Sequence, residues 1–253
     1  MEWSKIKNIL IIALLLTNIL LLFMIIFDGG KKNESEIPVP IDEAISILEK
    51  NGITVSCPTD FHEIMLSALT LTFDEDNGIE YYATDPKISL DLDKKTAKKT
   101  ADSFIEKSEA YDSIKKDLFF VSANPFQHTD GEIYYTVSYG GFFQGYRLTD
   151  CYLICTVTPS GVSKIEKHWA KAEISSEKAY ILPLSEGLLT YMTGYGKNQP
   201  VKNREITDIS LVYSVESPME DKVSTDTAFP SWKITSSDGK TGFVNAYSLN
   251  NGH

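Results

Sequence analysis

The feature that most constrains this chain is an apolar run near its start, from Ile6 to Phe27. From Ile9 to the end of the run no side chain is charged, and only Thr17 and Asn18 are polar. A helix needs roughly 20 apolar residues to cross the hydrocarbon core of a bilayer. A cleaved signal peptide is the alternative, but its apolar core covers only about 7–15 residues and ends at small residues. This run is longer and ends in large apolar residues, so it predicts a retained transmembrane helix at residues 6–27.

The charges and the lengths on either side of the run indicate its orientation. Lys5 and Lys7 lie at its start, while Lys31 and Lys32 follow it, so the positive-inside rule is nearly balanced. The net charge is −11, of which the first 27 residues contribute +1, so residues 28–253 carry −12. A short basic amino terminus stays inside more readily than a long acidic body. We therefore expect a cell-membrane protein with a cytoplasmic amino terminus, residues 1–5, and an extracellular body.

The body divides into a linker and two predicted domains. Gly29, Gly30, Pro38 and Pro40 interrupt regular structure, so residues 28–40 are expected to form a linker. The remaining length suits one large domain or two small ones. The order of predicted helices and strands favours two extracellular domains, at residues 41–171 and 172–253.

Apolar spacing predicts the elements of the first domain. Helices are expected over residues 42–50 and 93–110, with Asp93 as the cap of the second. Strands are expected over residues 53–56, 64–73, 79–83, 133–139, 151–157 and 162–170. The acidic stretch Asp74 to Gly78 is interpreted as the tip of a hairpin between the second and third of these strands. Calcium binding is the weaker alternative, since an EF-hand loop would place glycine where Ile79 stands.

The second domain is expected to repeat the order of one helix and three strands. Ser185 is interpreted as the cap of a helix that ends at Gly194. Strands are predicted over residues 206–216, 228–236 and 241–248, the last two joined by an Asp238-Gly239 turn. The fold class predicted is α+β: antiparallel sheets with helices packed on one face, in repeated helix-strand-strand-strand units, after one N-terminal transmembrane helix.

Motifs that carry catalytic chemistry are missing from the sequence. There is no Gly-x-Ser-x-Gly, no His-Glu-x-x-His and no phosphate-binding glycine loop. His128 and His168 each stand alone, and the glycine-rich stretch from Tyr139 to Tyr146 lies between two predicted strands, which favours a bulge or a wide turn. We expect no enzyme, no cofactor and no metal site. The acidic balance also argues against nucleic acid as a partner.

The three cysteines predict buried thiols. Cys151 and Cys155 are four residues apart in one predicted strand, a separation of about 13 Å that is too long for a disulfide. Cys57 could pair with only one of them. No Cys-x-x-Cys occurs, so zinc or redox chemistry has no sequence support.

Both ends of the chain resemble one family. The opening Met-Glu-Trp-Ser-Lys-Ile-Lys-Asn-Ile at residues 1–9, leading into the apolar run, resembles the start of the YycI (WalI) family. The segments Ile209–Tyr213, Ala228–Ile234 and Gly242–Ala246 resemble the closing hairpin of that family, with its Pro-x-Trp-x-Ile strand. Between Tyr81 and Lys178 only the order of elements matches.

The resemblance implies a function. It indicates a non-catalytic, membrane-anchored extracellular regulator of a cell-wall-controlling two-component system (YycFG/WalRK) in a Gram-positive-type cell. The partners implied are a sensor histidine kinase of the YycG (WalK) type and a YycH-like regulator, contacted through the transmembrane helix and the extracellular body. An anchored extracellular module that binds a cell-wall fragment or a peptide is the alternative.

One face of the predicted transmembrane helix is a candidate partner-binding site. The amide of Asn18 lies near the middle of the run, where it favours hydrogen bonds to another helix. Simple tolerance of a single amide is the alternative. Helical spacing places six apolar residues beside Asn18, and these complete the predicted face: Ile11, Leu14, Leu15, Leu21, Leu22 and Ile25.

Overall fold

The computed structural model describes residues 38–85, 91–129, 131–196, 204–215 and 224–247. The chain divides into two units, residues 1–38 and 39–253, and the description below concerns the second. The predicted transmembrane helix at 6–27, its partner-binding face and most of the predicted linker therefore lie outside the described residues. Within the described ranges, no helix is both long enough and apolar enough to cross a membrane.

Three α-helices are found in the described part of the chain: α2 (Ile41–Lys50), α3 (Lys94–Lys107) and α4 (Leu184–Gly196). Asp93 caps α3 as predicted, because its Oδ1 accepts a hydrogen bond from the backbone N–H of Thr96 at 2.6 Å. The prediction of Ser185 as a helix cap is wrong, since α4 begins one residue earlier and continues past Gly194. Two short 3₁₀ turns, η1 (Glu109–Tyr111) and η2 (Lys115–Asp117), follow α3.

Strands make up most of the regular structure in the described residues. They are β1 (Ile53–Val55), β2 (Met65–Leu66), β3 (Leu69–Phe73), β4 (Gly78–Tyr81), β5 (Leu118–Gln127), β6 (Ile133–Phe143), β7 (Tyr146–Thr158), β8 (Gly161–His168), β9 (Ala170–Ile174), β10 (Ala179–Tyr180), β11 (Arg204–Val215), β12 (Thr225–Ser236) and β13 (Thr241–Asn245).

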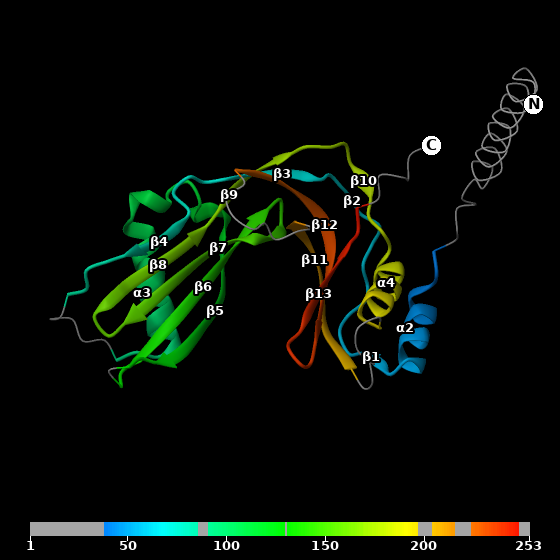
Figure 1. Cartoon of the computed structure of the whole chain (residues 1–253), viewed down its shortest axis with the longest axis horizontal. Coiled ribbons are helices and arrows are strands. Elements are labelled where there is room, and N and C mark those ends of the chain that lie inside the picture. The colour runs from blue at the N-terminus through cyan, green and yellow to red at the C-terminus, as the bar shows by residue number, and fades with distance from the viewer. Residues whose placement is uncertain (1–37, 86–90, 130, 197–203, 216–223, 248–253) are drawn as a thin grey trace, which may run out of the picture. The chain divides into compact units, whose positions relative to one another are not determined.

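Eleven of these strands form one mixed sheet, and β2 pairs separately with β10 (Figure 1). Strands β5, β6, β7, β8 and β4 are antiparallel neighbours in that order. Strand β7 also meets the later part of β11 in parallel, through only two residue pairs, and β1 meets the first residues of β11 in parallel. Strand β12 is antiparallel to β11. On its other side, its first part pairs with β3 and its second part with β13. Strand β9 completes the sheet beside β3.

The predicted α+β fold of repeated helix-strand-strand-strand units is wrong. The structure is mostly β, with one large mixed sheet, and α3 is followed by six strands before α4. Two parallel pairings to β11 join segments that lie far apart in the chain, and local sequence patterns do not encode such pairings. The predicted hairpin at Asp74–Gly78 is also wrong, because β3 pairs with β9 and β12 whereas β4 pairs with β8.

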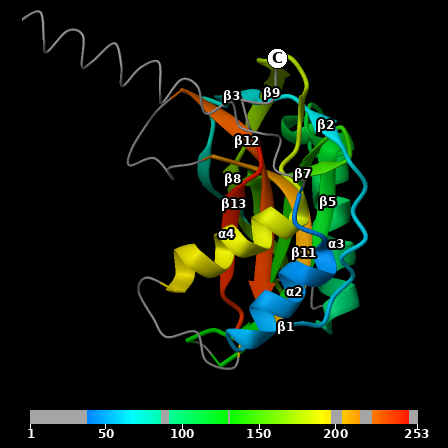
Figure 2. The same ribbon diagram turned by 90° about the vertical axis from the view of Figure 1, so that its right-hand side faces the viewer.

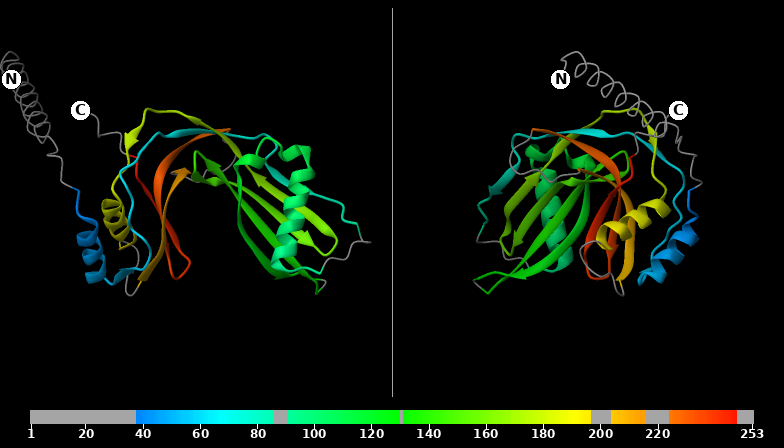
Figure 3. Two further views of the ribbon diagram at one scale, coloured as in Figure 1. Left: turned by 180° about the vertical axis from the view of Figure 1, so that it is seen from behind. Right: turned by 45° about the vertical axis from the view of Figure 1, so that its right-hand side comes forward.

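The sheet carries two hydrophobic cores. The α3 core lies between α3 and strands β5 to β8, and it is extended by residues of β3, β11 and β12. The α2/α4 core lies between those two helices and strands β1, β11, β12 and β13. Figure 2 shows α2 and α4 side by side over β11 and β13, and Figure 3 shows α3 lying across the strands of the other core. Strands β11 and β12 contribute side chains to both cores, for example Tyr213 to the first and Trp232 to the second.

Candidate functional site

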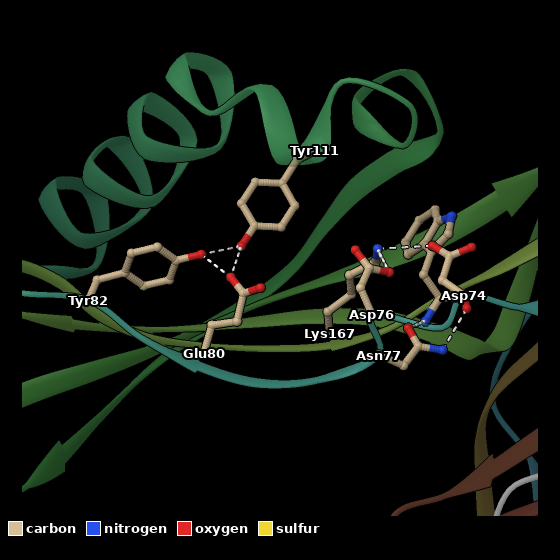
Figure 4. A network of polar contacts seen from close by, with 8 residues as sticks. Asp74, Asp76, Asn77, Glu80, Tyr82, Tyr111 and Lys167 are labelled. Atoms are coloured by element: carbon tan, nitrogen blue, oxygen red, sulfur yellow. Dashed lines mark hydrogen bonds and ion pairs between the residues drawn. The ribbon is translucent and has the colours of Figure 1, made fainter.

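A buried lysine lies at the turn between β3 and β4. Lys167 of β8 is only 9% exposed, because it shares the inward strand face with Ile165. Its Nζ lies 2.9 Å from Oδ2 of Asp74 and 2.7 Å from Oδ1 of Asp76 (Figure 4). A charge at such a depth is stable only when it is paired. The acidic turn therefore supplies the counter-charge for a strand that lies far along the chain.

Asn77 fixes the same turn to the junction of β8 and β9. Its Nδ2 donates a hydrogen bond to the carbonyl of Trp169 at 2.8 Å, and the N–H of Trp169 donates to its Oδ1 at 2.7 Å. The N–H of Asp74 donates to the same carbonyl at 3.0 Å. No group of three His, Cys, Asp or Glu side chains that could hold a metal occurs in the described ranges. In this turn the ammonium group of Lys167 lies where a bound cation would have to lie.

Electrostatics keep Lys167 charged. Burial alone would lower the pKa of its ammonium group, but the hydrogen bonds to Asp76 and Asp74 outweigh burial and raise that pKa above its ordinary value. A lysine with a raised pKa remains a cation at neutral pH. Lys167 is thus suited to holding a turn and poorly suited to acting as a nucleophile or a base.

A second group of polar contacts connects β4 to the segment after α3. The hydroxyl of Tyr82 donates to a carboxylate oxygen of Glu80 and lies 2.8 Å from the hydroxyl of Tyr111 (Figure 4). The Tyr111 hydroxyl is also 3.4 Å from Glu80, and the ring of Tyr82 packs edge-on against Phe104 of α3. Burial, followed by the bond to Tyr82, raises the pKa of Tyr111. These tyrosines therefore stay protonated and act as hydrogen-bond donors that hold β4 against the α3 side of the sheet.

The thiols are free and poorly suited to nucleophilic chemistry. Cys151 and Cys155 are buried and Cys57 is half-buried, with none in a disulfide. Burial raises the pKa of both Cys151 and Cys155 to about 12. Burial also raises the pKa of Cys57, and the nearby charge of Asp208 adds to this effect. Protonated thiols are weak nucleophiles and weak metal ligands.

The structure places the other residues considered from sequence in separate surroundings. His128 stacks on Tyr134 with ring centroids 4.6 Å apart. His168 donates from Nδ1 to the carbonyl of Asp150 at 2.6 Å and stacks on Tyr152. A bulge or a wide turn is expected between two strands in the glycine-rich stretch. The structure has a bulge, where the register of β6 against β7 shifts between Gly140 and Gly141, but these glycines lie inside β6 and not between strands. The seven residues of the predicted transmembrane face lie outside the described residues.

Sequence reasoning missed the site around β4. We call the ion pairs of Lys167 with Asp74 and Asp76 the Lys167 clamp. Its residues Lys167 and Asp76 are 91 positions apart in the chain, and the predicted hairpin paired β4 with β3 instead of with β8. One signal was available: Ile165 is the apolar residue in the middle of β8, and Lys167 lies two residues further along the strand, on the same inward face. A lysine at an inward position predicts an acidic partner nearby.

Comparison with known proteins gives little further information. No family model matches this chain, and no curated protein matches it. Among solved structures, the chain aligns with the crystal structure of an uncharacterized protein from Eubacterium rectale, with a TM-score of 0.40 and 16% sequence identity. The alignment covers 67% of this chain and spans 60% of the length of that chain. A likeness at this level does not establish a shared fold.

Proposed function

We propose that this protein is a non-catalytic, membrane-anchored regulator of a sensor histidine kinase, with its folded body outside the cell. The observation that carries the anchoring is the apolar run at residues 6–27, which is long enough to cross a bilayer. The net charge of −12 on the residues after it supports a body that projects away from an anionic membrane surface.

The kinase as partner rests on the resemblance of both chain ends to the YycI family. The three closing segments of that resemblance fall in β11, β12 and β13, which are consecutive hydrogen-bonded neighbours. Trp232, in the middle of the Pro-x-Trp-x-Ile strand, donates its indole N–H to the carbonyl of Leu182 at 2.8 Å and packs edge-on against Phe61. The three closing segments of the resemblance thus belong to one packed part of the molecule, which supports treating these segments as a single feature.

The contact with the kinase is proposed to include the helix face around Asn18. An amide within hydrocarbon favours a hydrogen bond to a neighbouring helix, although such bonds often contribute only about 0.6 kcal/mol. The surrounding face of Ile11, Leu14, Leu15, Leu21, Leu22 and Ile25 would supply the packing that accompanies it. A YycH-like regulator is the second partner expected at the same membrane.

The test replaces residues 8–27 of the predicted transmembrane helix with an unrelated apolar sequence of equal length, so that Lys5 and Lys7 stay in place. The kinase should no longer co-purify with the replaced chain from detergent, and phosphorylation of its response regulator should change. Leu16→Ala, on the face opposite Asn18, is the matched control and should alter neither result. Unchanged co-purification and unchanged phosphorylation after the replacement would show that the helix does not mediate regulation.

A further inference from the structure

The antiparallel strands β5, β6, β7, β8 and β4 end in two edges of different character. Within the described residues, β5 pairs only with β6, and β4 pairs only with β8. An edge strand presents unpaired backbone N–H and C=O groups, which another strand can use. Proteins that avoid such pairing interrupt the edge with proline, with a bulge or with charge.

The β5 edge is interrupted. The register of β5 against β6 shifts between Phe120 and Ser122, which marks a bulge. The N–H of His128 donates a hydrogen bond to the carbonyl of Glu132, and in an antiparallel pair every second residue makes such bonds. Pro125 is three residues before His128, so its backbone nitrogen and carbonyl face away from β6. Proline has no N–H, so the outward side of β5 lacks a donor at its centre. This edge is poorly suited to accepting another strand.

The β4 edge has neither a proline nor a bulge. The N–H of Tyr82 donates to the carbonyl of Ser163 at 2.9 Å. Because hydrogen-bonded residues alternate in an antiparallel pair, the backbone groups of Glu80 and Gly78 also face β8. The N–H and C=O groups of Ile79 and Tyr81 consequently face away from the sheet. The register of this ladder has no shift, and the strand contains no proline.

Side chains along β4 add an apolar face to these free backbone groups. Ile79 is 51% exposed and Tyr81 is 78% exposed. Because side chains alternate along a strand, both lie on the face opposite α3, whereas Glu80 points to the α3 side and reaches the two tyrosines (Figure 4). A strand added at this edge would meet two apolar side chains on one face and a carboxylate on the other.

The charge around β4 indicates the chemistry of the added strand. Lys167 compensates Asp74 and Asp76, whereas no ion pair compensates Glu75 or Glu80 among the described residues. The neutral tyrosine hydroxyls leave the charge of Glu80 in place. A second copy of β4 would bring two Glu80 side chains close together, which destabilises a strand pair. A segment with basic side chains opposite Glu80 is favoured instead.

We infer that the free edge of β4 accepts an extended segment of a partner protein as an added strand, with basic residues alternating with apolar ones. The basic residues would face Glu80, and the apolar residues would contact Ile79 and Tyr81. The backbone groups of Ile79 and Tyr81 would supply two donors and two acceptors. This inference does not depend on the partner being a kinase.

The test uses the full chain in lipid nanodiscs and two synthetic peptides, one that alternates lysine with valine and one that alternates glutamate with valine. Fluorescence anisotropy should show the lysine peptide binding at least about tenfold more tightly than the glutamate peptide. Hydrogen exchange at the amides of Ile79 and Tyr81 should slow when the lysine peptide binds. Exchange at the outward amide of Ala123 in β5 should not change.

Two variants distinguish the contribution of the backbone hydrogen bonds to peptide binding from that of the Glu80 charge. Ile79→Pro removes one outward donor and leaves the bonds between β4 and β8 in place, so binding should weaken about tenfold. Glu80→Gln keeps a hydrogen-bond acceptor for the tyrosines, and it should reduce the preference for the lysine peptide without abolishing binding. Ile79→Thr, which keeps the donor, is the matched control for Ile79→Pro and should weaken binding less.

Three outcomes would overturn the inference. Equal binding of the lysine peptide to the Ile79→Pro and unsubstituted chains would show that the edge is not used. Slower exchange in β5 instead of β4 would place the strand elsewhere. Self-association of the chain that Ile79→Pro abolishes, without binding of either peptide, would assign the edge to a second copy.

Discussion

The α3 core and the α2/α4 core rest on one sheet, yet they are closed by different kinds of interaction. The rim of the α3 core contains the Lys167 clamp, the Tyr111 contacts and a hydrogen bond from Tyr139 to Asp102 at 2.7 Å. The α2/α4 core is closed mainly by packing, in which Trp232 lies directly against Gly187 of α4. Hydrogen bonds and ion pairs thus surround the apolar core under α3, whereas the contacts of α2 and α4 with the sheet are mainly apolar packing. The two cores should therefore respond differently to pH and to changes in side-chain volume.

The largest expected effect is in the α2/α4 core. Trp232→Ala should lower the free energy of unfolding by about 3–5 kcal/mol, because it leaves a large cavity and removes the indole bond to Leu182. Thermal or denaturant unfolding of the purified chain measures this. Trp232→Phe keeps most of the ring and should cost clearly less. Equal losses from the two substitutions would mean that the hydrogen bond, and not shape, closes this core.

The next effect is in the α3 core. Lys167→Met should cost about 1–3 kcal/mol, because it leaves two carboxylates beside an apolar stem. The cost stays below that of a fully buried pair, since Asp76 is 64% exposed and water can solvate it. Adding Asp74→Asn to Lys167→Met should recover part of the loss. A double variant no more stable than Lys167→Met alone would show that the clamp contributes through packing of the lysine stem.

The Lys167 clamp also has a defined pH dependence. The pKa of Lys167 is raised in the folded chain, so its contribution is fully present below the unfolded value of 10.5 and is lost as pH rises above it. The difference in unfolding free energy between the unsubstituted chain and Lys167→Met should therefore shrink above about pH 10.5. A difference that stays constant through this range would exclude a charge effect.

An effect that is absent at neutral pH and appears only above about pH 9 concerns a buried thiol of the α3 core. The pKa of Cys155 is about 12 in the folded chain against an ordinary 9.0, so between these values the unfolded chain releases a proton that the folded chain keeps. Stability should then fall with rising pH, by up to about 1.4 kcal/mol per pH unit from this group. Cys155→Ala should make the slope shallower. Cys57→Ala, at a half-buried thiol beside the other core, is the control and should change the slope less.

The smallest expected effect concerns Gly187. A Cβ at this position would lie 2.6 Å from the Trp232 ring, which must shift to accommodate it. Overpacking of this kind costs about 1–3 kcal/mol, and replacing glycine with alanine inside a helix regains about 1 kcal/mol. Gly187→Ala should thus lower stability by roughly 1 kcal/mol in unfolding experiments. A gain in stability would indicate that Trp232 has room to move and that shape controls this core less tightly than proposed.

Sequence reasoning predicted the α2/α4 core better than the α3 core. The helix expected at residues 42–50 corresponds to α2. The predicted Asp238-Gly239 turn joins β12 to β13, with Gly239 at a φ of 79°. Apolar periodicity and a turn that requires positive φ are local signals, and both occur within a few residues. These signals suffice where neighbours in the chain are neighbours in space.

The α3 core depends on information that local patterns do not contain. Strand β5 was not predicted, because Ser122, Asn124 and Pro125 are unusual in a strand, and an edge position tolerates them. Pairing of β4 with β8, instead of with β3, goes together with the ion pairs of Lys167 with Asp74 and Asp76, which also join segments far apart in the chain. The candidate site around β4 was missed for the same reason. The site residues predicted from the apolar run stay a prediction, because they lie outside the described residues.

The division of β12 between two neighbours has a consequence for the time at which this protein can fold. Strand β3 needs the first part of β12 beside it, yet the ribosome makes residue 225 long after residue 72. The hydrogen bonds between β3 and β12 therefore cannot form until nearly the whole chain has been synthesised. Contacts of such high sequence separation slow folding and leave strand edges exposed in the meantime. Newly made chains should consequently depend on chaperones until their last strands arrive.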